Sequence, residues 1–179
     1  ITLPHTPFVE PLTVLHQWQG ICYYKKKITI TPEEAKKHIW IEFEGAMHLA
    51  DVWINGKHVM QHAGGYTPFV VDATGLLKTG KENELLVRLD NRNNSLIPPG
   101  KPLETLDFCY YGGIYRNVHL IAKADVHITH PILDGHPAGA GIFITYPKVS
   151  QELSVVDAKT EIKNTSDKEK VVELRHTLY

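Results

Sequence analysis

Alternation of apolar and polar residues recurs along this 179-residue chain, and it is the feature that most limits the possible folds. The pattern is clear in residues 39–44, 50–54 and 85–90, where apolar side chains occupy every second position. Residues two apart share a face of a β-strand, whereas a helical face needs a spacing of three or four. Each stretch therefore predicts a half-buried antiparallel strand, and the chain as a whole is expected to be all-β.

Turn residues support this expectation. Asn55-Gly56 separates two strand-like runs and predicts a tight hairpin, because both central positions of such a turn favour a positive φ. Thr31-Pro32 opens one short helical turn that reaches Lys36. Residues 90–107 are too polar and too rich in proline for a strand, and loops of this length are usually functional or disordered.

A domain boundary is expected near residues 123–125, which divides the chain into 1–124 and 125–179. Short strands are predicted in the second part at 126–130, 142–146, 153–163 and 170–178. Short strands joined by turns favour an immunoglobulin-like sandwich, but a complete one needs about 100 residues. The second domain is therefore predicted to be truncated, with an open edge that another chain covers or that is poorly ordered.

Composition excludes several classes of partner. The net charge of -1 offers no basic field for a nucleic acid, and no stretch approaches the ~20 apolar residues of a membrane helix. The two cysteines, Cys22 and Cys109, are expected to be buried free thiols, and a disulfide between them stays open. The sequence begins at Ile1 without an initiator Met, so localisation also stays open between the cytoplasm, the periplasm and the cell exterior.

No nucleotide-binding or nucleophile-elbow motif is present, and the eleven histidines lack zinc-ligand spacing and are expected at the surface or in loops. Trp18, Trp40 and Trp53 could stack on sugars, but packing is the favoured interpretation. Hydrolysis of a glycoside needs two carboxyl groups at a defined separation. Glu42 and Glu44 share a strand face, but they are better explained as solvent-facing charge, so no complete catalytic site is predicted.

Several blocks of the chain closely resemble, in the same order, the sugar-binding domain of family two glycoside hydrolases. The blocks are 41–46, 50–57, 62–69, 83–91 and 112–118, preceded by the N-terminal motif Leu3-Pro4-His5. The resemblance covers about residues 1–122, and the remainder is similar to the immunoglobulin-like second domain of the family, cut short. It implies a jelly-roll β-sandwich (galactose-binding-like) over 1–124, followed by a partial immunoglobulin-like β-sandwich over 125–179.

The resemblance also implies candidate site residues. In β-galactosidases of the family, the aspartate nine residues before the arginine of the Gly-Ile-Tyr-Arg-like motif contacts the galactosyl group or a bound sodium ion. That position is Asp107 here, and a loop carboxylate can accept hydrogen bonds from sugar hydroxyls or coordinate a hard cation. His5 ends the N-terminal motif and Thr6 follows it, at a position where the family often has Asp or Asn. His5, Thr6 and Tyr111 are further candidates for substrate binding.

The function implied is the non-catalytic N-terminal portion of a β-galactosidase-like hydrolase, with a loop at the rim of an active site. In the family that site lies in a (β/α)8 barrel that carries both catalytic glutamates. The expected partners are a β-galactoside-type carbohydrate and this barrel, and a homo-oligomer is also considered. No cofactor is required, and sodium or magnesium is the metal that the resemblance allows, with Asp107 as candidate ligand. Two alternatives stay open: a stand-alone carbohydrate-binding module, and a scaffold domain without a ligand.

Overall fold

The computed structural model describes residues 1–8, 17–108, 111–136 and 140–179. The chain forms two compact units, Ile1–Ala122 and Lys123–Tyr179, and each is described by itself. Within the described ranges the regular elements are strands and two single 3-10 turns, which confirms the all-β prediction. None of the helical segments in these ranges has the length and apolar character needed to cross a bilayer.

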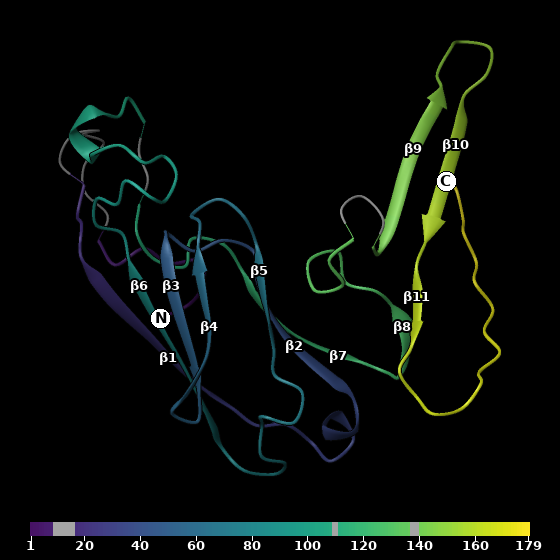
Figure 1. Ribbon diagram of the computed structural model, residues 1–179, viewed down its shortest axis with the longest axis horizontal. Helices are drawn as coiled ribbons and strands as arrows, with labels where there is room; N and C mark the ends of the chain where they lie inside the picture. The colour runs from purple at the N-terminus through teal and green to yellow at the C-terminus, as the bar shows by residue number, and fades with distance from the viewer. Residues whose placement is uncertain (9–16, 109–110, 137–139) are drawn as a thin grey trace. The chain divides into compact units, whose positions relative to one another are not determined.

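The first unit is a sandwich of two sheets (Figure 1). One sheet has the strand order β1-β6-β3-β4 and the other has the order β5-β2-β7. Neighbours in the four-stranded sheet are antiparallel, as are β2 and β5. The elements are β1 (Ile21–Ile28), η1 (Glu34–Lys36), β2 (His38–Phe43), β3 (Leu49–Ile54), β4 (Lys57–Ala63), β5 (Phe69–Asp72), β6 (Asn83–Asp90), η2 (Leu103–Thr105) and β7 (Val118–Lys123).

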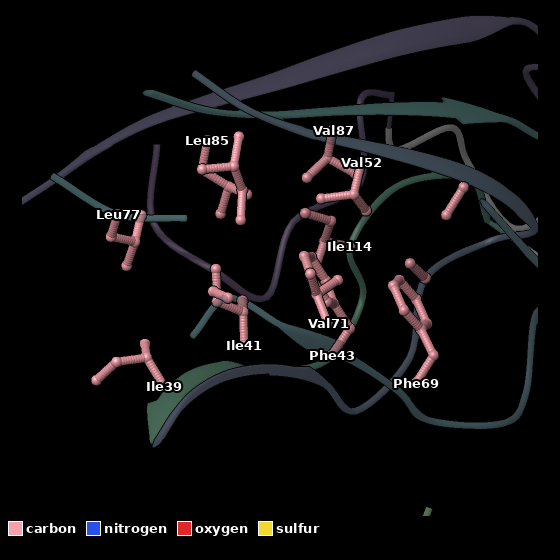
Figure 2. Close-up of a cluster of buried hydrophobic side chains, with 14 of the residues drawn as sticks. Ile39, Ile41, Phe43, Val52, Phe69, Val71, Leu77, Leu85, Val87 and Ile114 are labelled. Carbon is pink, nitrogen blue, oxygen red and sulfur yellow. The ribbon is translucent and has the colours of Figure 1, made fainter. Parts of the chain in front are cut away.

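The core of this unit lies between the two sheets, where the alternating apolar residues face one another. Figure 2 shows Val52 and Val87 of the four-stranded sheet extending toward Phe43 and Val71 of the other, with Ile114 between them. All five side chains are at most 2% exposed. Burial of each such side chain stabilises the fold by roughly 1.5–3 kcal/mol. The alternation in the sequence therefore identifies the inner face of these strands correctly.

Local turn chemistry also follows the sequence. Asn55 and Gly56 have φ values of 51° and 79°, which closes the hairpin between β3 and β4. At the start of η1, the Thr31 N–H donates to Oε2 of Glu34 and the Glu34 N–H donates to Oγ1 of Thr31. This reciprocal pair satisfies two backbone donors and fixes the single helical turn that the sequence predicts.

Two side-chain expectations need correction or restriction. The histidines are not all at the surface or in loops, because His127 lies within β8 and is 8% exposed. His48 and His130 lie in loops, as expected, although both are buried. Cys22 is a half-buried free thiol, and its burial raises its pKa to about 11. Cys109 lies outside the described residues. Trp40 is 5% exposed, which agrees with a packing role.

The second unit contains two separate pairs of strands. Strand β8 (Val126–Ile128) pairs with β11 (Ile162–Asn164), and β9 (Ile142–Lys148) pairs with β10 (Val155–Thr160). The strand predicted at 170–178 is absent, and residues 165–179 contain no strand. Nε2 of His176 in that stretch lies 2.8 Å from Oγ1 of Thr160 in β10, but the apolar residues stay largely exposed, with Val171 at 99% and Leu178 at 82%. Strand propensity alone does not form a strand without a hydrogen-bonding neighbour.

Candidate functional site

Three segments of the first unit that are far apart in sequence meet at Gly113. The N–H of Met47 donates to the carbonyl of Gly113 at 3.0 Å, and the N–H of His5 donates to the carbonyl of Ile114 at 2.8 Å. The N-terminal segment, the connection between β2 and β3, and the end of the long β6–β7 connection therefore lie side by side. This edge of the sandwich holds the candidate residues His5, Thr6 and Tyr111.

Glycine is required at the centre of this meeting point. Gly113 has a φ of 107°, and a Cβ atom there would lie 2.6 Å from both the carbonyl oxygen of His5 and the hydroxyl of Tyr24. At Gly112 a Cβ atom would lie 2.6 Å from Nδ2 of Asn91. These distances are too short for any side chain. The Gly-Gly pair thus allows close backbone packing.

Asn91 anchors the other end of the long connection. This residue directly follows β6 and is 2% exposed. Its Oδ1 accepts from the N–H of Gly20 at 2.7 Å, and its Nδ2 donates to the carbonyl of Trp18 at 2.9 Å. Because Gly112 packs against the Asn91 side chain, residues 91 and 112 form the two sides of one neck, and the described residues 92–108 belong to a loop closed at its base.

Asp107 lies on this loop directly after a buried anchor. Leu103, the first residue of η2, and Leu106, directly after η2, pack with Met47, and Tyr115 packs against this cluster. The N–H of Leu103 donates to Oδ1 of Asn93 at 3.0 Å. Asp107 itself is exposed, and within the described part of the chain its carboxylate makes no hydrogen bond or ion pair. The loop is therefore anchored by buried residues, and the Asp107 carboxylate is exposed to solvent without a hydrogen bond or ion pair to the described residues.

Tyr115 fixes the end of the connection to the segment after β4. Its hydroxyl donates a short hydrogen bond to the carbonyl of Gly65. The guanidinium carbon of Arg116 lies 5.9 Å from the centre of the Tyr115 ring, within the range of a cation–π contact. Both residues are thus placed to anchor the end of this connection.

His5 is held by Tyr24 of β1. Its Nδ1 lies 2.9 Å from the Tyr24 hydroxyl, and the two rings pack edge to face at 5.6 Å between centres. Burial raises the pKa of Tyr24 to about 12, so this hydroxyl stays protonated and neutral. The neighbouring Thr6 donates from Oγ1 to the carbonyl of Phe8 at 3.5 Å, which is a weak bond.

The four candidate residues are therefore only partly brought together. His5 and Thr6 belong to a segment that packs on Gly113, and the half-buried Tyr111 lies two residues before it. Asp107 is anchored separately through Leu106, and none of the described contacts joins it to His5 or Thr6. Sequence reasoning did not assign a role to Asn91, although its position directly after a predicted strand and before a polar loop is a signal for such an anchor.

The described residues offer few side chains that could bind a metal ion together with Asp107. Asp107 supplies one carboxylate, and the described residues contain no cluster of three His, Cys, Asp or Glu side chains that could hold a metal ion.

Comparison with known sequences gives a consistent set of relatives. A family profile described as "Glycosyl hydrolases family 2, sugar binding domain" matches residues 6–124. The chain is 34% identical over 170 residues to a β-glucuronidase of Bacteroides fragilis, covering 92% of this chain and 23% of that protein. It is 36% identical over 167 residues to a β-galactosidase of Thermoanaerobacter pseudethanolicus, covering 91% and 22%.

Solved structures show the same relationship. A β-glucuronidase of Bacteroides uniformis matches with a TM-score of 0.77 and 33% identity, over 93% of this chain and 19% of that one. A putative β-galactosidase from Bacteroides fragilis matches with a TM-score of 0.76 and 29% identity, over 93% and 24%. The chain thus spans roughly a fifth to a quarter of the length of these relatives.

Proposed function

Because the chain belongs to glycosyl hydrolase family 2, through the sugar-binding domain that residues 6–124 match, we propose that it is the non-catalytic, sugar-contacting portion of a β-glycosidase. The reaction is hydrolysis of an O-glycosidic bond. The two carboxyl groups that this chemistry needs are assigned to a catalytic barrel of the same polypeptide. The part described here supplies a rim to that active site.

The observation that carries this proposal is the state of Asp107. Its carboxylate is exposed and unpaired within the described residues, while the backbone just before it is held by the buried Leu103 and Leu106. A rigid support with a free polar group at its tip is suited to contact a ligand. Asp107 is therefore proposed to accept hydrogen bonds from substrate hydroxyls, with His5, Thr6 and Tyr111 along the neighbouring edge.

The substrate is proposed to be a β-galactoside. One group of relatives carries the name β-galactosidase, and a carboxylate acceptor matches the donor hydroxyls of a neutral sugar. A second candidate is a β-glucuronoside, because other relatives of similar identity are named β-glucuronidases. The two sugars differ in the configuration of the C4 hydroxyl and at C6, which is a hydroxymethyl group in the galactoside and a carboxylate in the glucuronoside. That carboxylate would be repelled by a nearby Asp107 carboxylate.

The test is kinetic and uses the full-length enzyme. Replacement Asp107→Asn keeps the shape of the side chain but removes its charge. Because a hydrogen bond to a charged group contributes about 1.5–3 kcal/mol, kcat/KM for a chromogenic β-galactoside is expected to fall roughly 10- to 100-fold. The thermal unfolding midpoint should stay unchanged, since Asp107 makes no described contact.

Glu104→Gln is the matched control, because Glu104 is an exposed carboxylate in the same loop. It should leave kcat/KM unchanged. The 179-residue chain alone is expected to show no turnover. Equal kcat/KM for wild type and Asp107→Asn would remove Asp107 from the site and favour a scaffold domain, whereas turnover by the chain alone would overturn its non-catalytic role. A stand-alone carbohydrate-binding module would instead act without a catalytic barrel, and Asp107→Asn would then have no effect on catalysis.

A further inference from the structure

A polar cleft of about 600 Å³ opens beside the loop neck, where β3 begins and β6 ends. Its volume is within the range of small-molecule sites. Five of its side chains carry planar polar groups and one is a carboxylate, and the apolar Leu49 completes the lining. The polar residues are Gln19, His48, Asp90, Arg92, Asn93 and Asn94.

Hydrogen-bond donors without acceptors are concentrated in this cleft. Oδ1 of Asn93 accepts from Gln19 Nε2 and from the N–H of Leu103, at 2.8 and 3.0 Å. Oδ1 of Asn94 accepts from the N–H of Leu96 at 2.9 Å. These bonds fix both amides, but neither Nδ2 group has an acceptor among the described residues. The amides are thus pre-oriented with their NH2 groups unused.

Arg92 adds a third fixed donor group. Its Nε donates to Oδ1 of Asp90 at 2.9 Å, and one terminal nitrogen donates to Oδ2 at 2.7 Å. The second terminal nitrogen makes no hydrogen bond within the described part of the chain. A guanidinium held on one side by a carboxylate presents its remaining N–H groups in a defined direction.

The charges around the cleft cancel. Arg88 donates to Oδ2 of both Asp51 and Asp90, at 3.1 and 3.2 Å, so two guanidinium groups are matched by two carboxylates. The hydrogen bond from Arg92 lowers the pKa of Asp90, which keeps it ionised. Burial lowers the pKa of His48, which favours its neutral form. A ligand with a full charge gains little here, whereas a ligand with many uncharged oxygen acceptors fits.

We propose that this cleft is a second saccharide subsite that binds a neutral sugar unit through Arg92, Asn93 and Asn94. Sugar hydroxyl and ring oxygens accept from the fixed N–H groups, and Leu49 offers an apolar surface to a sugar C–H face. The 103–106 segment, held by Asn93, leads directly to Asp107, so the subsite adjoins the proposed rim of the active site. The idea that one longer substrate occupies both this subsite and the active site rests on the proposed function, whereas binding of a sugar in the cleft does not.

Binding is tested on the 179-residue chain without any catalytic readout. Methyl β-galactoside and methyl β-glucoside are titrated while the side-chain amide signals of Asn and Gln are followed by NMR. The signals of Asn93, Asn94 and Gln19 should shift, and glucuronate should bind more weakly than either neutral sugar. Asn94→Asp keeps the oxygen that caps Leu96 but removes the NH2 donor, and it should weaken binding about five- to tenfold.

Asn164→Asp is the matched control, because its Oδ1 caps the N–H of Ser166 with the same two-residue spacing and it lies in the other unit. It should leave binding unchanged. The absence of shifts at Asn93, Asn94 and Gln19, unchanged binding by Asn94→Asp, or tighter binding of glucuronate would each overturn the proposal. If a variant does not fold, the shifts of the side-chain amide signals in the wild-type chain still test the proposal. A failure here leaves the Asp107 kinetics untouched, so the two proposals fail separately.

Discussion

At the scale of single residues, Gly113 and Gly56 show two separate reasons for a glycine. Both have a positive φ, of 107° and 79°. A Cβ atom at Gly56 would meet nothing within 4 Å, whereas one at Gly113 would meet the His5 carbonyl and the Tyr24 hydroxyl. Backbone strain is therefore the only obstacle to a side chain at Gly56, but a steric overlap is added at Gly113.

Replacement Gly113→Ala should consequently lower the free energy of unfolding by about 3 kcal/mol, against about 1 kcal/mol for Gly56→Ala. Urea unfolding of the two variants measures the difference. In the full-length enzyme, Gly113→Ala should also reduce kcat/KM, because it displaces the segment that carries His5. Equal destabilisation by the two variants would mean that the crowding at Gly113 relaxes without cost.

The candidate site was only partly predictable from individual residues. The resemblance singled out Asp107, and its exposure is compatible with that role. The role of Asn91 could not be read from the sequence, because its partners Trp18 and Gly20 are more than 70 residues away. A side chain that bonds distant backbone groups leaves no local periodicity, so only the folded chain shows it.

At the scale of elements, Asn83 connects the start of β6 to its surroundings. This residue is fully buried, and its Nδ2 lies within hydrogen-bond distance of the carbonyls of Ile28, Lys78 and Lys81. Its Oδ1 accepts from the N–H of Lys78 and from Nδ2 of Asn55. One amide thus joins the end of β1, the turn before β6 and the β3–β4 hairpin.

Asn83→Ala should therefore destabilise the first unit by about 3 kcal/mol, because several buried polar groups lose their partner. Chemical denaturation followed by tryptophan fluorescence measures this change. Lys101→Ala, at an exposed position whose side chain makes no hydrogen bond or ion pair within the described part of the chain, is the control and should shift stability by less than about 0.5 kcal/mol. A small effect at Asn83 would show that water replaces the amide.

Strand prediction succeeded where alternating residues have a second sheet to cover them, as in β2, β3 and β6. It failed at 170–178, where the pattern is similar but the residues are not paired in a ladder with any described strand and their apolar side chains stay largely exposed. Periodicity identifies which face a strand would bury. Whether the strand forms depends on a pairing partner, which periodicity does not specify.

At the scale of the whole chain, the two units differ in how much apolar surface they bury. The first has a core of sixteen buried apolar residues. In the second, the residues of β9 alternate toward solvent, with Ile142 and Tyr146 at 56% and 63% exposure. The buried side chains described in the second unit are mainly polar, among them His127, Thr129 and His130. Apolar burial supplies most of the driving force of folding, so the first unit should be the more stable.

Hydrogen exchange should show this difference directly. Backbone amides of β3 and β6 are expected to exchange only on global unfolding, whereas those of β9 and β10 should exchange at least about 100-fold faster. Mass spectrometry of peptides from the intact 179-residue chain resolves both regions in one sample. Equal protection in the two units would contradict the prediction and would indicate a single cooperative unit.

The neck formed by Asn91 and Gly112 has a consequence for how substrate preference can change. Since Asn91 and Gly112 lie against each other at one point of the sandwich, the length and composition of the chain between them can vary while the two sheets keep their register. Both the Asp107 tip and the Arg92–Asn94 wall of the cleft belong to this one stretch. Under the two proposals, the preference for a sugar can thus be changed by exchange of this one stretch, without changes in the two sheets.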